Sequence, residues 1–80
     1  MIGIKLSQKA KTLKKGLYQH YKNEQKRYRV LGVAIHSETL EEMVLYQPLY
    51  GKKLPWVRPL KVFLEKLVVN GKKVPRFKKL

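Results

Sequence analysis

The 80-residue chain contains no cysteine and no aspartate, and its five acidic residues are all glutamate. Without cysteine, neither a disulfide nor a thiolate metal site can stabilise a domain of this size, which has little core of its own. No apolar run approaches the roughly 20 residues of a membrane span, and the N-terminal lysines alternate with apolar residues, unlike a secretory signal. We therefore expect one cytoplasmic domain, stabilised by tight turns and by the hydrophobic 44% of its residues.

Few residues are available for catalysis or for metal binding. His36, Ser37 and Glu38 are adjacent, and neighbours on a strand point to alternate faces, so they do not converge as a catalytic triad does. The two histidines and the glutamates lack a recognised ligand spacing, and there is no glycine-rich phosphate loop. We expect no enzymatic activity, no metal and no cofactor. Instead, Ser37 and Thr39 are expected to hydrogen-bond the loop backbone.

Positive charge is what the chain has in excess. Nineteen Lys and Arg residues give a formal net charge of +14, with net +8 in residues 1–29, +1 in residues 30–70 and +5 in residues 71–80. A field of this size attracts polyanions, nucleic acid first, although lysine-rich ends can also serve solubility alone. The residues predicted to contact nucleic acid are Lys14, Lys15, Lys22, Lys72, Lys73, Arg76, Lys78 and Lys79.

Residues 1–15 form a basic N-terminal extension in this interpretation, and residues 16–80 form the folded domain. Apolar residues in the extension and just after it recur at steps of three and four, which is one face of a helix: Ile2, Leu6, Ala10, Leu13 and Leu17. A helix this short is marginal by itself. We therefore expect the extension to be helical or disordered, to lie outside the sheet and to add little stability.

The central segment from Tyr28 to Thr39 predicts a buried strand, because apolar residues occupy both faces around Gly32. Shorter apolar runs on either side predict its partners. The expected strands cover residues 17–22, 27–36, 42–50 and 54–58, separated by a polar turn at 23–26, a loop at 37–42 and a turn at 51–53. Pro48 cannot donate to a ladder, which indicates an edge or a bulge in the third strand.

The C-terminal third predicts a helical turn and a hairpin. Pro59 begins a helical period through Leu64. Asn70-Gly71 is a strong signal for a type I′ turn between strands at residues 65–69 and 73–77, followed by a basic tail at 78–80. The predicted fold class is all-β, a small SH3-like barrel with about five short strands, one helical turn and a C-terminal hairpin. A five-stranded OB-type barrel is the alternative.

Aromatic residues suggest where a ligand binds. Trp56 and Arg58 lie two residues apart on one strand face, and aromatics beside cations can stack bases or form a peptide groove; alternatively, Trp56 belongs to the core. The candidate ligand-binding residues are Tyr46, Trp56, Arg58, His36, Ser37, Glu38 and Thr39. The leading hypothesis is a nucleic-acid-binding module, RNA before DNA. The alternative is a peptide- or protein-interaction module around Trp56 and Tyr46. A third hypothesis is an enzyme or small-ligand receptor built on His36, Ser37 and Glu38.

The assembled motifs resemble a bacterial family known as the domain of unknown function 1653. The motifs are Gly16–Lys22 (GLYQHYK), Tyr28–Ala34 (YRVLGVA), His36–Thr39 (HSET), Val44–Tyr50 (VLYQPLY), Trp56–Leu60 (WVRPL), Phe63-Leu64 and Gly71–Phe77 (GKKVPRF). They occur in order over roughly residues 15 to 80. The resemblance implies a stand-alone small β-domain and brings no activity, substrate or catalytic residue. This chain departs from the family pattern at Gln19 and Ile35, where arginine is usual.

Overall fold

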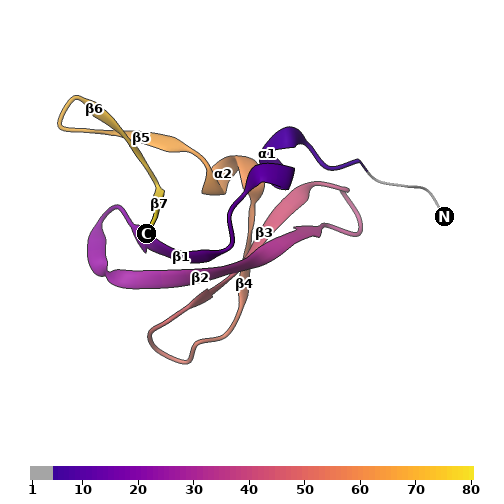
Figure 1. The fold of residues 1–80 in the computed structure, drawn as a ribbon, viewed down its shortest axis with the longest axis horizontal. Helices are drawn as coiled ribbons and strands as arrows, with labels where there is room; N and C mark the ends of the chain where they lie inside the picture. The colour runs from indigo at the N-terminus through magenta and orange to yellow at the C-terminus, as the bar shows by residue number, and fades with distance from the viewer. Residues whose placement is uncertain (1–4) are drawn as a thin grey trace.

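The computed structural model describes residues 5–80, which form two antiparallel sheets and two short helices (Figure 1). In chain order the elements are α1 (Gln8–Thr12), β1 (Gly16–His20), β2 (Asn23–Ile35), β3 (Glu42–Pro48), β4 (Trp56–Pro59), α2 (Leu60–Phe63), β5 (Lys66–Val69), β6 (Lys72–Pro75) and β7 (Phe77–Lys79). The predominantly β class is therefore confirmed. Within the described part of the chain, neither helix has the length and apolarity to cross a bilayer.

Five strands form one curled, open sheet in the order β4-β3-β2-β1-β7. No pairing joins β4 to β7 among residues 5–80, so the closed SH3-like or OB-type barrel that the sequence suggested is not found. A side-chain contact joins these two strands. The Arg58 guanidinium carbon on β4 lies 5.6 Å from the ring centroid of Phe77 on β7.

The long strand β2 forms the centre of the sheet, as its apolar sequence predicts. Its pairing with β3 shifts register between Val30 and Gly32, which is the irregularity that a glycine in mid-strand favours. The predicted turn at residues 23–26 is wrong, because Asn23 already belongs to β2 and the turn lies at Tyr21-Lys22. His20 supports this turn, its Nδ1 accepting a hydrogen bond from the Lys22 backbone N–H at 3.1 Å.

The predicted C-terminal hairpin is confirmed. Asn70 and Gly71 have φ of 51° and 78°, as a type I′ turn requires, and they join β5 to β6. The expected strand at 73–77 instead divides into β6 and β7, and β7 pairs with β1. The prediction of a basic tail at 78–80 is thus wrong, because Lys78 and Lys79 belong to β7 and pair with β1. This pairing joins residues far apart in the chain, so the local sequence around Phe77 does not specify it.

The core is an aromatic cluster on the inner side of the curled sheet. The largest fully buried side chains among the described residues are those of Tyr46, Phe63, Val30 and Val44. The Phe63 ring, supplied by α2, stacks on Phe77 with centroids 4.5 Å apart. The single helical turn expected after Pro59 is therefore confirmed, and it places one aromatic residue at the centre of the core.

The described part of the N-terminal extension is helical and contributes to the core. Ala10 on α1 is buried in the main cluster, and Leu6 and Leu13 pack against that cluster. The Ser7 hydroxyl caps the helix by accepting from the Ala10 N–H at 3.1 Å. The Ser7 hydroxyl also donates to the Glu42 carboxylate at 2.7 Å, and this bond lowers the pKa of Glu42. Ile2 lies outside the described residues. The expectation that the extension adds little stability does not fit these contacts. Its periodic apolar residues Leu6, Ala10 and Leu13 all contact the core.

Candidate functional site

The aromatic candidates divide between the core and the surface. Tyr46 is only 2% exposed, so its ring is not open to a ligand; it faces inward because it lies two residues after buried Val44, on the same face of β3. Trp56 is 47% exposed, so the alternative that placed it in the core is wrong. Trp56 and Arg58 share a strand face, as expected. Trp56 packs edge-on against the Tyr46 ring, and the Arg58 Nε donates to the Tyr46 hydroxyl at 3.2 Å.

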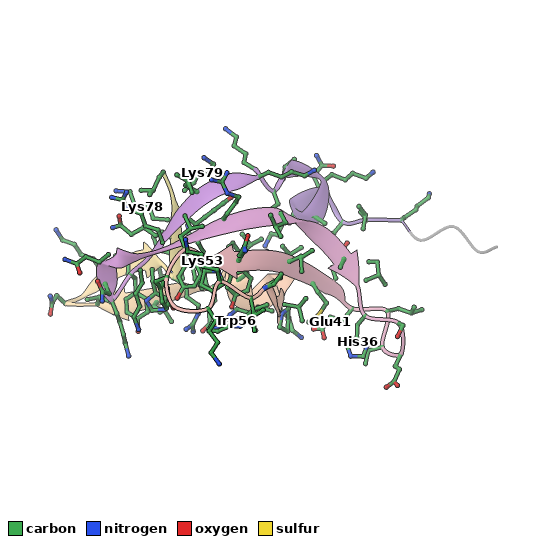
Figure 2. All side chains as sticks on the ribbon, turned by 90° about the horizontal axis from the view of Figure 1, so that it is seen from below. His36, Glu41, Lys53, Trp56, Lys78 and Lys79 are labelled. Carbon is green, nitrogen blue, oxygen red and sulfur yellow. The ribbon has the colours of Figure 1, made fainter. Side chains whose placement is uncertain are left out.

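The loop from His36 to Glu41 is held by an imidazole. The His36 Nδ1 accepts hydrogen bonds from the backbone N–H groups of Glu38 at 3.2 Å and Thr39 at 3.3 Å. The Thr39 hydroxyl accepts from the Glu41 N–H at 3.2 Å, as expected, whereas the Ser37 side chain makes no hydrogen bond to the described residues. Figure 2 places His36 and Glu41 at one end of the sheet, away from Trp56. The loop therefore has a structural role and does not join the aromatic residues in one site.

Replacing His36 by Ala is expected to lower the free energy of unfolding by about 1–2 kcal/mol, because two backbone N–H groups lose their shared acceptor. Chemical denaturation followed by circular dichroism measures the change. Ser37→Ala in the same loop is the matched control and should have little effect, within about 0.5 kcal/mol. Equal losses for the two variants would contradict this account of the loop.

Four cations project from the outer face of the sheet, which is the face turned away from the core. Arg27 and Arg29 alternate along β2 with buried Tyr28 and Val30, so their side chains lie on the opposite face. Lys78 likewise follows buried Phe77 on β7. The stem of Lys15 lies over Gly32, with Cε 3.7 Å from the position that a Cβ would take there. We call the exposed residues Lys15, Arg27, Arg29 and Lys78 the outer basic face.

Strand register brings these cations together from distant parts of the sequence. Gln19 on β1 pairs with Arg27 on one side and with Lys78 on the other. Lys78 and Arg27 are therefore two strands apart, about 10 Å, although they are 51 positions apart in the sequence. The sequence-based prediction of nucleic-acid contacts does not include Arg27 and Arg29, because it assigns their charge only to the N-terminal part of the chain. Their alternation with Tyr28 and Val30 was the signal that could have identified them.

Two other predicted contacts, Lys14 and Lys79, lie beside a separate cleft of about 480 Å³ between α1 and the edge of the sheet. Lys9 and Lys66 also line this cleft, and its apolar side is formed by Leu13, Tyr18 and Leu64. The Lys79 Nζ donates to the Leu80 carbonyl at 2.7 Å and lies 5.8 Å from the Tyr18 ring centroid. Lys79 is therefore held locally, on the face opposite Lys78 (labelled in Figure 2).

The remaining predicted contacts are dispersed. Lys22 lies at the β1–β2 turn, with Nζ 5.8 Å from the Tyr21 ring centroid. Lys72 and Lys73 belong to the β5–β6 hairpin, which extends away from the five-stranded sheet in Figure 1. Arg76 pairs with Glu65, Nη2 to Oε2 at 3.6 Å, and is largely buried. Burial lowers the pKa of nearby His20, and the charge of Arg76 lowers it further. The chain ends therefore do not act as one basic surface.

Four of the five glutamates, Glu38, Glu41, Glu42 and Glu65, lie away from the outer basic face. Glu41 faces Lys61 on α2, Oε2 to Nζ at 3.8 Å, and Glu42 bonds Ser7. Glu38 occupies the loop after β2, and Glu65 is paired with Arg76. Within residues 5–80, no three His, Cys, Asp or Glu side chains are grouped so that they could hold a metal ion. The chemistry that this surface offers is attraction of negatively charged groups.

Comparisons with known proteins agree with the motifs. The sequence model of a family described as "Protein of unknown function (DUF1653)" matches residues 16–79. A crystal structure of a DUF1653 protein from Bordetella bronchiseptica is similar, with a TM-score of 0.78 and 30% sequence identity over 89% of this chain and 91% of that chain. No curated protein matches the chain. The resemblance inferred from the sequence is confirmed, and the chain belongs to the DUF1653 family.

Proposed function

We propose that this protein is a non-enzymatic nucleic-acid-binding module that holds a phosphate backbone on its outer basic face, RNA before DNA. The observation that supports this most directly is the register of β1, β2 and β7, which groups Arg27, Arg29 and Lys78 on one exposed surface. Arginine suits such a surface because its guanidinium donates to phosphate oxygens in a bidentate geometry.

The surroundings of this surface favour the same function. Figure 1 shows α1, α2 and the β5–β6 hairpin on one side of β1 and β2, and on the other side the loop between β3 and β4. The loop that carries Glu38 and Glu41 lies at the end of the sheet (Figure 2). A bound backbone can therefore cross the cationic strands without meeting these carboxylates, which would repel it.

Affinity should depend steeply on salt, because neutralising phosphates releases counterions. Contact with about four to six phosphates gives a log–log slope near −3 to −5. Combining Arg27→Gln, Arg29→Gln and Lys78→Gln should make this slope about 2–3 less steep, since each lost contact contributes roughly 0.7–0.9. Fluorescence anisotropy of labelled RNA and DNA oligomers, titrated at several salt concentrations, measures the slope.

A matched control removes three charges elsewhere. Combining Lys61→Gln, Lys72→Gln and Lys73→Gln changes the net charge equally but affects only α2 and the hairpin. We expect a much smaller change in slope for this control. Equal changes would mean that total charge matters and that the outer face is not an interface. No binding of RNA or DNA at low salt would refute the proposed function.

Gln19 offers a test by gain of function. It lies between Lys78 and Arg27 in the register, so Gln19→Arg should complete a row of three cations across β7, β1 and β2. This variant is expected to bind RNA more tightly at low salt and to steepen the slope by about 0.7–0.9. Gln8→Arg on α1 adds the same charge away from the row and serves as its control.

A further inference from the structure

An apolar groove with a lysine rim lies at the end of β3, where the chain turns into β4. Its lining includes Pro48, Tyr50, Lys52, Lys53, Leu54 and Trp56, and its volume is about 300 Å³. We call it the Trp56 groove. Such a volume is at the lower end of the range for small-ligand sites, so the groove suits one flat group and not an extended molecule.

The groove is held in shape by its neighbours. The Trp56 ring meets the buried Tyr46 ring edge-on, with centroids 6.2 Å apart and planes at 86°. The loop between β3 and β4, which forms the other side of the groove, is held by the Gln47 Nε2, which donates to the Lys53 carbonyl at 2.6 Å. Tyr50 is tied to the core through its hydroxyl, 2.6 Å from that of Tyr28. A ligand therefore meets an aromatic surface whose position is already fixed.

Exposure and charge indicate the kind of ligand. Trp56 and Leu54 are 47% and 61% exposed, which leaves apolar surface open to solvent. Lys52 and Lys53 line the groove, the Nζ of Lys26 lies 5.6 Å from the Tyr50 ring centroid, and no carboxylate is among the lining residues. An apolar surface whose charged lining residues are lysines complements a flat apolar group attached to a negative charge.

We propose that the Trp56 groove binds an unpaired base of single-stranded nucleic acid, with the base stacked on Trp56 and its phosphate near Lys52 and Lys53. This inference rests on the proposed function and extends it. Gln47, which fixes Lys53, pairs with Arg29 in the sheet, so the Lys53 side of the groove borders the outer basic face, whereas Trp56 lies on the core side beside Tyr46. Bases in a duplex are already stacked, whereas single strands can place a base on an aromatic ring.

Trp56 is the single tryptophan of the chain, so its fluorescence reports directly on this groove. Titration with a 12-nucleotide oligouridine at low salt should quench the fluorescence, and a fully paired RNA duplex with the same number of phosphates should not. Trp56→Ala should weaken oligouridine binding by roughly 5- to 150-fold, the contribution of one stacked base, and leave duplex binding unchanged. Trp56→Phe should retain much of the affinity because it keeps an aromatic ring.

Val57→Ala provides the matched control. Val57 is the next residue on β4, is also exposed, and points to the opposite strand face. Circular dichroism confirms that each variant is folded, and Trp56→Phe gives the test if Trp56→Ala unfolds. Oligouridine binding without quenching, and equally affected by Trp56→Ala and Val57→Ala, would overturn the base site while leaving the proposed function intact. Failure of every nucleic acid to bind, with quenching by a proline-rich peptide, would overturn both and assign the groove to a peptide.

Discussion

Phe63→Ala is expected to lower the free energy of unfolding by about 3–5 kcal/mol, the usual cost of removing a large aromatic side chain from a core. Phe63 is 1% exposed, and its ring stacks on Phe77 at 4.5 Å and meets Tyr18 edge-on at 5.4 Å. Native domains are stable by only about 5–15 kcal/mol, and one of 80 residues has a small core. The variant should therefore be largely unfolded under mild denaturing conditions, as urea titration followed by circular dichroism will show.

Lys61→Ala in the same short helix is the control for Phe63→Ala. Its side chain is exposed and its contact with Glu41 is long, at 3.8 Å, so the expected change is within about 0.5 kcal/mol. Phe63→Leu should fall between the two variants, because it retains part of the apolar volume. A loss below about 1 kcal/mol for Phe63→Ala would show that α2 does not complete the core.

The double variant Leu6→Ala/Leu13→Ala is expected to destabilise the domain by about 2–4 kcal/mol. Both leucines are partly buried against the aromatic core on either side of α1, and each loses roughly 1–2 kcal/mol of burial. This expectation reverses the interpretation of residues 1–15 as an extension with little effect on stability. Thermal and urea unfolding of the variant measure the loss.

Lys5→Ala/Lys11→Ala changes two exposed residues next to the same contacts and should leave stability almost unchanged. If the leucine and lysine variants unfolded alike, α1 would be a detached extension after all. The comparison also matters for function. With α1 docked, Lys9 and Lys14 stay beside the cleft near Tyr18 and do not extend freely into solvent.

The sequence alone determined the turns and strands that depend only on neighbouring residues. Asn70-Gly71 specified its turn through the positive φ that both residues tolerate. Pro59 began a helical turn, and the apolar run around Gly32 became the central strand. Motifs spread over the chain also identified the family correctly. In each case the information lies in neighbouring residues or in their order, so no knowledge of tertiary contacts is required.

Tertiary structure decided which residues face a ligand. Whether Tyr46 or Trp56 is exposed depends on their places in the sheet, since both are aromatic residues on β-strands. The return of β7 to β1 turned an expected tail into a strand and brought Lys78 near Arg27. Net charge could be counted from the sequence, but its division between faces could not. That division follows from the register of strands far apart in the chain, and local pattern does not encode such pairing.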